Sequence, residues 1–301
     1  MAKVLITGGS GMIGTALTKL LLDAGHRVSH LSRNPVSKDG YTAYKWDIDQ
    51  DFIDLEAFKG VDTIIHLAGS EIVDHKWTEE WKKVIVDSRV KTANLLHKTM
   101  LDNDLQIEQF ISASGISYYA MDVFDEQLNE DSPAGKTFLA DVCVSWEAAA
   151  DQFGDCASKV VKLRIGMVLE KGLGVLRTIE PVVKGFLGAG LGTGKQSMNW
   201  IHMNDVCRMF EHTVSERLTG VYNAVGPESA DNQEFMQTLA DVMSRAIFLP
   251  NIPETLISLI FGQKAVLVLE GSPLSSHKIE ETGFHFDYPT LNTALMSIYS
   301  D

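Results

Sequence analysis

Three glycines near the start of the chain have the type and spacing needed to hold a phosphate group. Residues 7–14 read Thr-Gly-Gly-Ser-Gly-Met-Ile-Gly, which places Gly8, Gly11 and Gly14 three residues apart. In such a loop the first glycine allows a sharp turn, the second lets the backbone approach a pyrophosphate, and the third lets a strand and a helix pack closely. Glycines also fill ordinary turns, but here an apolar strand pattern precedes the loop and a helical pattern follows it. The segment therefore predicts a dinucleotide-binding loop at a helix N-terminus.

The residues at the end of the second predicted strand indicate which dinucleotide is bound. A carboxylate at this place binds the ribose hydroxyls of NAD, whereas an arginine accommodates the additional phosphate of NADP. This chain has Ser32, Arg33 and Asn34 there, and neither Asp nor Glu. A guanidinium can hold a phosphate through two parallel hydrogen bonds, and a neighbouring hydroxyl adds a donor. The sequence favours NADP(H); a solvated surface arginine is the alternative interpretation.

The elements that must position these residues alternate through the first half of the chain. Apolar, β-branched runs alternate with segments of helical periodicity, which is typical of βαβ units that form a parallel sheet. Strands are expected at residues 4–7, 27–32, 42–46, 61–67, 109–112 and 160–163, with a helix after the glycine loop and a long helix at residues 79–103. We therefore expect an α/β fold with a Rossmann-like doubly wound parallel sheet and helices on both faces.

The pattern changes after about residue 170. Glycines are frequent in residues 172–194, Pro181 is expected to interrupt the segment, and residues 200–202 and 220–225 have strand patterns. From Asn232 onward the tail is mostly helical. We expect a Rossmann-like NADP-binding domain over residues 1–226, with its core at 1–170 and with 171–199 contributing to a substrate lobe. A small, mainly helical C-terminal domain is expected over residues 227–301.

The composition excludes several classes of function. The 301 residues include 26 Lys and Arg against 40 Asp and Glu, a formal net charge of -14, so no basic surplus is present to bind nucleic acid. No apolar stretch approaches the roughly 20 residues of a membrane span, and the apolar stretch before the first glycines is too short for a signal peptide. The three cysteines are odd in number and lack metal-ligand spacing, so neither disulfides nor a metal site is predicted. We expect a cytoplasmic protein.

A set of separated motifs resembles one protein family over almost the whole chain. The opening loop is similar to that of the extended and atypical short-chain dehydrogenase/reductase superfamily. Further motifs resemble its subfamily of NADP-binding, NAD-dependent epimerase/dehydratase-like proteins with a short C-terminal domain. They are His66-Leu67-Ala68-Gly69, Lys76-Trp77-Thr78, Asp87-Ser88-Arg89-Val90, Ser117-Tyr118-Tyr119, Trp146-Glu147-Ala148-Ala149, Gly192-Thr193-Gly194, Trp200-Ile201-His202 and Leu267-Val268-Leu269-Glu270-Gly271. Eight motifs in the family's order make the resemblance specific.

The resemblance implies a cofactor site drawn from several segments. The pyrophosphate would be held by Gly8, Gly11, Met12, Ile13 and Gly14, and the adenosine-ribose phosphate by Ser32 and Arg33. The adenine side would lie near Asp47, Ile48, Leu67, Ala68 and Gly69, with Arg89 and Val168 as further contacts. Leu67, Ala68 and Val168 are alternatively core residues, and Arg89 alternatively forms an ion pair on a helix surface.

The usual catalytic pair of the superfamily is missing. Its members use a tyrosine as general acid/base and a lysine four residues later, one helical turn away. Anchoring the family pattern on Glu147 places Leu139 at the tyrosine position and Cys143 at the lysine position. Neither side chain performs that proton transfer, and Tyr41 and Lys45, which have the same spacing, belong to the third predicted strand.

Other residues are candidates for the chemistry. Ser114 follows the fifth predicted strand, where the superfamily keeps a hydroxyl that binds the substrate carbonyl, and Tyr118 and Tyr119 come just after it. Each can equally be a wall or core residue. Cys143 is more consistent with an inert buried thiol than with a nucleophile, because no histidine is near it in the sequence.

The substrate is indicated only by what is absent. Sugar-nucleotide epimerases of the superfamily place an arginine two residues before the Trp200-Ile201-His202 position to hold a diphosphate, and this chain has Met198 there, with Lys195 and Lys184 as the nearest cations. We expect an NADP(H)-dependent oxidoreductase or epimerase-like enzyme for a small substrate. The alternatives are an inactive NADPH sensor and a nucleotide-sugar epimerase with tightly bound NAD. The superfamily also implies a homodimer formed by the helices after the fourth and fifth strands.

Overall fold

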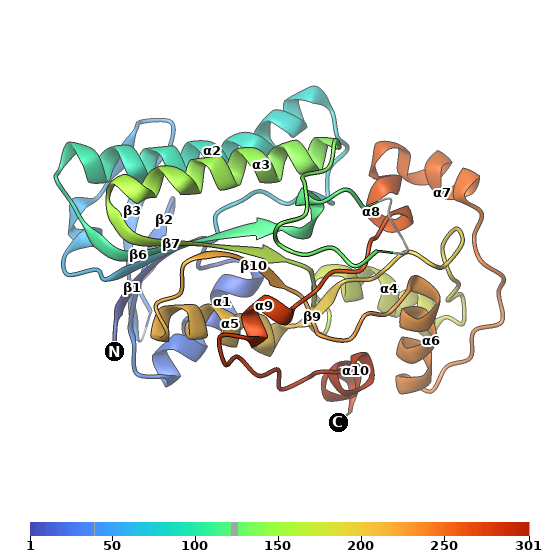
Figure 1. Ribbon diagram of the computed structural model, residues 1–301. Helices are drawn as coiled ribbons and strands as arrows, with labels where there is room; N and C mark the ends of the chain where they lie inside the picture. Colours follow the sequence, from blue (N-terminus) through green and yellow to red (C-terminus); the bar gives the residue numbers. More distant parts are fainter. Residues whose placement is uncertain (39, 122–125, 301) are drawn as a thin grey trace. The chain divides into compact units, whose positions relative to one another are not determined.

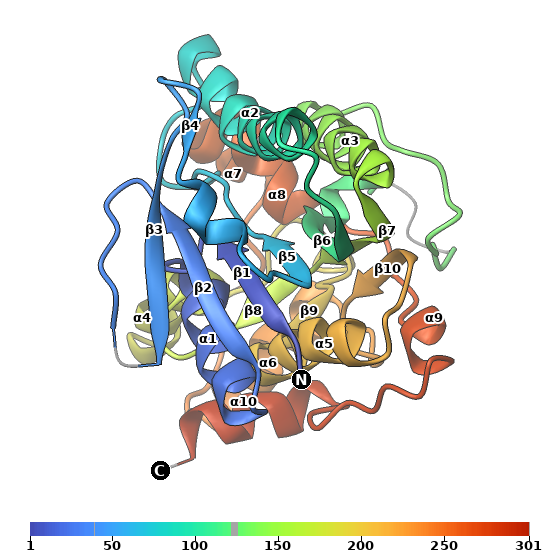
Figure 2. The same cartoon turned by 90° about the vertical axis from the view of Figure 1, so that its left-hand side faces the viewer.

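A computed structural model describes residues 1–38, 40–121 and 126–300 (Figure 1). Eight strands form one sheet in the order β10-β7-β6-β5-β1-β2-β3-β4, and the strand order reverses at β1. Figure 2 shows the strands side by side. The bounds are β1 Lys3–Thr7, β2 Arg27–Ser32, β3 Tyr41–Asp47, β4 Phe52–Ile53, β5 Thr63–His66, β6 Ile107–Gly115, β7 Ala157–Ile165 and β10 Gly220–Ala224.

The register of the central strands is parallel, as expected for a doubly wound sheet. β1 pairs with β2 on one side and with β5 on the other, with Thr7 opposite both Leu31 and His66. β5 continues in parallel to β6, whereas the two-residue β4 returns antiparallel to β3. The carboxyl ends of β1 and β5 therefore meet at the point where the strand order reverses, which is where ligands bind in open α/β sheets. The predicted Rossmann-like fold is confirmed.

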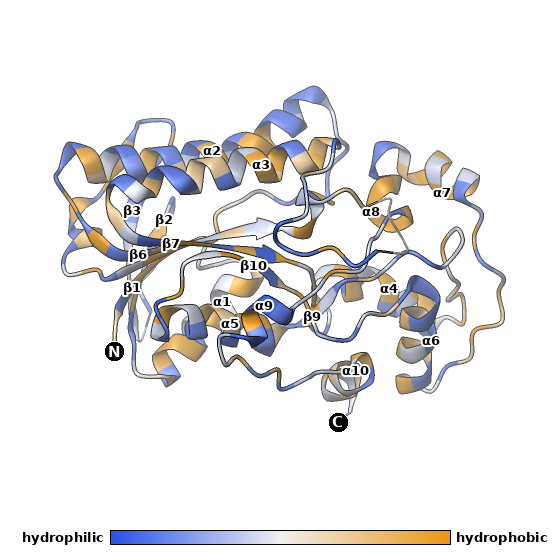
Figure 3. Cartoon of the chain, in the orientation of Figure 1, coloured by the Kyte–Doolittle hydropathy of each residue, from blue (hydrophilic) through white to orange (hydrophobic). Residues whose placement is uncertain are grey.

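Helices cover both faces of this sheet. α2 (Glu79–Asp102) and α3 (Phe138–Asp151) lie together on one face, and α1 (Met12–Asp23) lies on the other (Figure 1). These helices carry both polar and apolar residues (Figure 3), because one side of each packs on the sheet. A core cluster that includes Leu5, Ile64 and Phe110 fills the space under α2 and α3.

The chain divides into two compact units, each built from several segments. The first unit comprises residues 1–118, 137–164 and 207–222, and contains the sheet described above except for Ile165 of β7 and Asn223 and Ala224 of β10. The second comprises residues 119–136, 165–206 and 223–301. The boundary between residues 226 and 227 stays a prediction.

The second unit is mainly helical. Its core cluster includes Trp200, Phe235 and Leu295, and its two-stranded sheet pairs β8 (Met167–Leu169) in parallel with β9 (Trp200–His202). Its helices are α4 (Gly174–Lys184), α6 (Asn232–Val242), α7 (Glu254–Phe261), α8 (Val266–Leu269), α9 (His277–Glu280) and α10 (Leu291–Tyr299). α5 (Met203–Ser215) begins in this unit and ends in the first. None of the helices in the described ranges is long and apolar enough to span a bilayer.

Some expected elements differ from the structure. Pro181 does not interrupt its segment, because α4 continues through it to Lys184 while Leu176 and Val183 remain buried in the core. The lost hydrogen bond at a proline is offset here by this packing. β6 runs on to Gly115, so Ser114 lies inside the strand instead of after it. Val84 on α2 faces solvent, and the buried stripe passes through Ile85 and Arg89.

Candidate active site

The glycine loop is compact, and a side chain at Gly8 or Gly14 would meet backbone atoms. Gly8 has a φ of 71°, and a Cβ on it would come within 2.8 Å of the backbone carbonyl of Leu67. A Cβ on Gly14 would come within 2.3 Å of the Gly8 carbonyl oxygen. The Gly11 amide donates to that same oxygen at 3.0 Å and closes the turn. The structure thus brings Gly8 and residues 67–68, which are far apart in the sequence, into direct contact.

The first turn of α1 is open to an anion. Gly11 is the N-cap and has no side chain to accept a hydrogen bond from the helix, and the first turn carries no acidic residue. The first N–H groups of a helix have no partner within the helix, and they form the positive end of its dipole. Met12 and Ile13 supply such groups here. This end of the helix therefore suits a phosphate.

A buried histidine fixes the carboxyl ends of β1 and β5 relative to each other. His66 Nδ1 and the Thr7 hydroxyl are 2.8 Å apart, and the Ala68 amide donates to the same hydroxyl at 3.3 Å. His66 Nε2 lies 3.3 Å from the Thr92 hydroxyl of α2. Burial lowers the pKa of His66 to about 4, so the ring is neutral at neutral pH. The predicted cofactor contacts Leu67, Ala68 and Gly69 follow directly from this anchored strand end.

The residues expected at the adenosine end lie at the ends of β2 and β3. The Ser32 hydroxyl accepts a hydrogen bond from the Asn34 amide at 3.2 Å, and Arg33 is exposed. Asp47 accepts from the Asp49 amide at 3.2 Å. Ser32 and Arg33 stay candidates for the additional phosphate of NADP(H).

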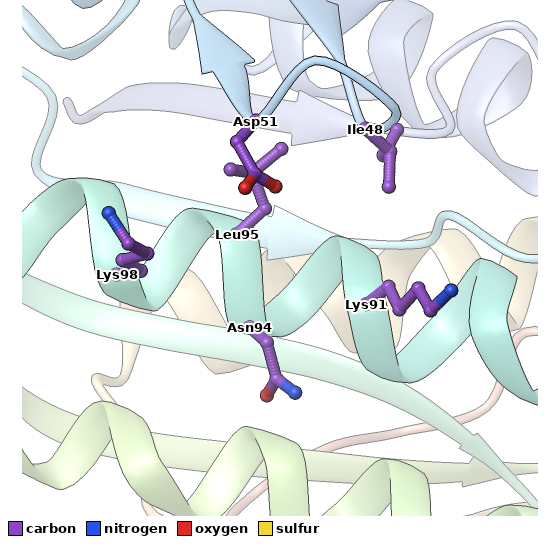
Figure 4. A pocket seen from close by; sticks show the side chains of 6 residues that line it. All are labelled: Ile48, Asp51, Lys91, Asn94, Leu95 and Lys98. Carbon is purple, nitrogen blue, oxygen red and sulfur yellow. The ribbon is translucent and has the colours of Figure 1, made fainter.

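Ile48 lines a small hollow between the turn after β3 and α2. The hollow has a volume of about 180 Å³, and Asp51, Lys91, Asn94, Leu95 and Lys98 also line it (Figure 4). Four of these six side chains come from α2. Ile48 also packs against the core cluster of the first unit. It is thus a partly buried residue at the end of β3, as a contact of the adenine would require.

Arg89 is a buried guanidinium surrounded by neutral groups. Its Nη1 donates to the carbonyls of Ser70 at 3.2 Å and Ile85 at 3.0 Å. Its Cζ lies 4.9 Å from the Trp146 ring, and burial lowers its pKa. Arg89 pairs with no carboxylate among the described residues, so the alternative of an ion pair on the helix surface is wrong. A buried cation without an anionic partner suits a site that receives an anionic or polar ligand.

Val168 lies in the second unit. It belongs to β8, is buried, and pairs in register with Ile201 of β9. Its backbone position is consistent with either interpretation from the sequence, a core residue or a cofactor contact.

The positions of the usual catalytic pair are buried on α3. Leu139 and Cys143 are 4% and 6% exposed. Burial is the largest cause that raises the pKa of the Cys143 thiol to about 11. Because the thiolate is the nucleophilic form, Cys143 is a poor nucleophile at neutral pH.

A buried polar cluster joins β6, α3 and β7 beside these positions. The Ser114 hydroxyl donates to Glu147 Oε1 at 2.8 Å. Arg164 holds the same carboxylate with two hydrogen bonds, from Nε to Oε1 at 2.8 Å and from Nη2 to Oε2 at 3.0 Å. The Arg164 guanidinium also lies 3.4 Å from the centre of the Tyr118 ring. Arg164 was missed by the sequence analysis, because residues 157–165 carry two lysines as well and nothing in the segment distinguishes Arg164 from them.

Tyr119 has a different environment from Tyr118. It is 1% exposed, and its hydroxyl donates to Asn223 Oδ1 at 2.6 Å within the second unit. The Asn223 amide in turn donates to the Ser275 carbonyl at 3.0 Å. Tyr118 is only half-buried and lies in the short 3-10 helix η2 (Ile116–Tyr118). Of the two tyrosines, Tyr118 is therefore the more accessible to a ligand.

Three further positions bear on the substrate. Met198 packs against the core of the second unit, and the Asn232 amide donates to its sulfur at 3.6 Å. Lys184 pairs with Glu180, and Lys195 is exposed. Within the described ranges, no three His, Cys, Asp or Glu residues gather as a metal site.

A parallel sheet that reverses its strand order beside a glycine loop and an uncapped helix N-terminus defines a protein of the Rossmann-like dinucleotide-binding class. More particularly, the chain belongs to the NAD-dependent epimerase/dehydratase family, whose model matches residues 4–225. A domain of unknown function, DUF1731, matches residues 252–298.

Similar proteins cover the whole chain. Epimerase family protein SDR39U1 of Homo sapiens is 34% identical over 98% of this chain and 99% of its own length. The crystal structure of its isoform 2 with NADPH has a TM-score of 0.87 at 32% identity, over 99% of both chains. A nucleoside-diphosphate sugar epimerase from Corynebacterium glutamicum has a TM-score of 0.78 at 26% identity, over 100% of this chain and 59% of that one.

Proposed function

We propose that this protein binds NADP(H) and catalyses a hydride-transfer reaction, oxidoreduction or epimerisation, on a small substrate with a carbonyl or hydroxyl group. The observation that carries the proposal is the contact of Gly8 with residues 67–68, which builds a phosphate cradle at the reversal point of the sheet. The similarity to a structure that contains NADPH supports the same cofactor.

The residues present fit this cofactor. The uncapped first turn of α1 offers N–H groups to the pyrophosphate. The exposed Arg33 follows β2 where a carboxylate would favour NAD, and Ser32 precedes it. Arg89 donates from Nη1 to neutral carbonyls, so the structure leaves its Nε and Nη2 donors for a bound ligand.

Tyr118 is the residue we assign to proton transfer. When bound, the nicotinamide supplies or accepts the hydride. Tyr118 donates its phenolic proton to the substrate oxygen during reduction and takes a proton from that oxygen during oxidation. Arg164 lies against its ring at 3.4 Å and is itself fixed by Glu147, so the ring is held by a buried ion pair. A cation on an aromatic face is attractive and limits the positions of the ring.

Ser114 orients this cluster from β6. Its hydroxyl donates to Glu147, and the same oxygen can still accept a hydrogen bond. We assign Tyr119 a positioning role and no role in proton transfer, because its hydroxyl already donates a hydrogen bond to Asn223. Both roles are proposals that follow from the contacts.

The test is deuteride transfer. The protein is incubated with NADPH deuterated at C4 of the nicotinamide and with a metabolite extract, and labelled products are sought by mass spectrometry. We expect a labelled product with the native protein and with Tyr44→Phe, a control tyrosine on β3, and at least a hundredfold less with Tyr118→Phe. Label that persists undiminished in Tyr118→Phe would overturn the assignment of the proton donor.

A second candidate is an NADPH sensor without catalysis. The burial of Leu139 and Cys143 at the usual catalytic positions favours it. A sensor requires different affinities for NADPH and NADP+, because a ligand shifts a conformational equilibrium only by its differential affinity for the two states. Absence of any labelled product together with unequal affinities would favour the sensor over the enzyme.

A further inference from the structure

Large apolar side chains of the second unit are exposed to solvent on three short stretches of the chain. Each of them is at least 44% exposed. They are Phe186, Leu187, Phe248, Leu249, Leu256, Leu259, Ile260 and Phe261. All of them belong to the second unit. These eight residues are called the apolar face below.

The stretches that carry the apolar face lie side by side. The connection between α6 and α7 (Figure 1) runs along residues 186–192. The Arg245 guanidinium carbon lies 5.3 Å from the centre of the Phe186 ring. Further along, the Ile252 amide donates to the Gly190 carbonyl at 2.8 Å, and α7 begins two residues later. The exposed apolar residues are therefore neighbours and not scattered single side chains.

α7 buries very little of its own surface. Of its eight residues, all of which the structure describes, Ile257 alone is buried. Leu259 and Ile260 are 82% and 66% exposed. Isolated helices shorter than about 12 residues are marginal in water, and most helical stability in proteins comes from the packing of an apolar face. α7 therefore has the features of a helix that another molecule covers.

The apolar face is large enough for a stable interface. With about 200 Å² for one fully exposed side chain of this size, the exposed fractions of the eight residues amount to roughly 900 Å². The largest apolar patch on a monomeric protein is typically about 300–600 Å². A standard protein interface buries about 800 Å² on each partner. The apolar face exceeds the usual patch of a monomer and matches one side of an interface.

One cation and one anion lie beside the apolar face. Arg245 is half-buried, and its Nη1 donates to the carbonyls of Met243 and Ser244. Glu254 is exposed at the first position of α7. Within the described ranges Arg245 pairs with no carboxylate and Glu254 with no cation. A surface with one unpaired charge of each sign is self-complementary, because a twofold axis brings each charge to the opposite charge of the other copy.

We propose that the apolar face is a contact between two copies of this chain. Residues 245–261 carry only these two charges in a chain of formal net charge -14, so two copies meet here without opposed carboxylates. Arg245 of each copy pairs with Glu254 of the other, on either side of an apolar centre formed by α7. Exposed Phe residues with an Arg and without Lys or Asp are also typical of interface composition. This contact differs from the one through α2 and α3 that the superfamily implies, and it does not depend on hydride transfer.

Sedimentation velocity over a range of protein concentrations tests the contact. Leu259→Glu should weaken self-association at least a hundredfold, because it places two carboxylates in the apolar centre. Met296→Glu changes an exposed apolar residue of α10 outside the apolar face, and it should leave self-association unchanged. Val144→Glu changes an exposed residue of α3 and tests the superfamily's contact. Unchanged self-association in Leu259→Glu, or a native protein that is monomeric at about 100 μM, overturns the proposal.

Charge reversal tests the pairing of Arg245 with Glu254. Arg245→Glu and Glu254→Arg each bring like charges together in the dimer and should each weaken self-association about tenfold or more. The double variant restores opposite charges and should self-associate within about threefold of the native protein. Circular dichroism verifies that each variant is folded. A double variant that is weaker than both single variants would show that the two residues do not face each other and would overturn the twofold arrangement.

A lipid surface is the other occupant that exposed Leu, Ile and Phe side chains fit. Flotation with phosphatidylcholine vesicles distinguishes it from a second copy of the chain. We expect the native protein to stay in the vesicle-free fraction. A protein that is monomeric in solution, floats with the vesicles and no longer does so as Leu259→Glu would assign the apolar face to lipid and overturn the proposal.

Discussion

The guanidinium of Arg89 lies directly against the backbone of Gly69. A Cβ on Gly69 would come within 2.9 Å of Arg89 Cζ and 3.1 Å of Arg89 Nη2. The two residues come from α2 and from the segment after β5, so the absence of a side chain at position 69 sets how closely the cation approaches the carboxyl end of β5. The residue at position 69 therefore determines where the guanidinium of Arg89, 20 positions later, can lie.

Gly69→Ala is expected to displace Arg89 and to weaken NADPH binding about tenfold through the lost contacts to the charged group. Fluorescence titration with NADPH measures the change. Gly154→Ala is the matched control, because nothing lies within 4 Å of a Cβ at that position. Equal affinity of the two variants would show that Arg89 does not meet the cofactor.

Replacement of Gly8 and of Gly25, which both have positive φ, should have different consequences. Gly8 and Gly25 have φ of 71° and 84°, but only at Gly8 would a Cβ touch other backbone atoms. Gly25→Ala should cost about 1 kcal/mol of stability from the left-handed conformation alone and should keep NADPH binding. Gly8→Ala should abolish NADPH binding. Thermal unfolding with and without NADPH separates the loss of stability from the loss of binding. Retained NADPH binding in Gly8→Ala would contradict the proposal that the contact of Gly8 with residues 67–68 forms the phosphate site.

The pair of Glu147 and Arg164 predicts a non-additive pair of substitutions. Arg164 is 3% exposed, so Arg164→Met leaves the buried Glu147 carboxylate with Lys162, 4.0 Å away, as its remaining cationic partner, and should cost about 3 kcal/mol in the free energy of unfolding. The double variant Glu147→Met with Arg164→Met removes both charges and should recover most of that loss. Guanidinium chloride unfolding of the single and double variants measures the coupling. Additive losses would mean that the two side chains act independently.

Cys143 should react slowly with alkylating reagents. With its pKa raised to about 11, only about one thiol in a thousand is ionised at pH 8. Iodoacetamide labelling followed by mass spectrometry should therefore leave Cys143 unmodified in the folded protein and modify it in urea. Rapid labelling of Cys143 in the folded protein would contradict this prediction and show that the thiol is a competent nucleophile.

His66 should make stability fall in mild acid. Its pKa in the folded protein, about 4, is below the ordinary value of 6.5, so the unfolded chain binds a proton between these values and the folded chain does not. The free energy of unfolding should therefore decrease as the pH falls from about 6.5 to 4, by on the order of 3 kcal/mol for this group. His66→Asn should reduce the slope in that window relative to the native protein. An unchanged slope would assign the pH dependence to other histidines.

The sequence predicts the parts of this site that depend on local pattern. The glycine loop, the strand at residues 27–32 and the long helix from residue 79 follow from spacing and periodicity within one segment, and the structure confirms them. Gly8 could be linked to residues 67–68 because the carboxyl ends of neighbouring parallel strands meet at one edge of the sheet.

Contacts between distant segments could not be predicted in the same way. Arg164 has the pattern of an outward-facing cation in a strand, and its partner Glu147 is 17 positions earlier on a helix. Gly9 lies outside the spacing of the three glycines, yet a Cβ on it would come within 2.5 Å of the His30 ring. β8 has only three residues, too few to show a period. Each of these features depends on how residues from two different elements face each other in the folded chain.

The segmented build of the first unit bears on how the chain folds during synthesis. The side-chain amide of Gln109, at the start of β6, donates to the carbonyls of Thr213 and Leu218, both at 2.9 Å. The first three residues of β10, the strand at the edge of the same sheet, also belong to the last segment of the unit. A nascent chain that ends near residue 170 has its glycine loop but lacks these partners, so one sheet edge and a buried amide stay unsatisfied. About fifty more residues must be synthesised after residue 170 before the sheet that carries the cofactor site is complete.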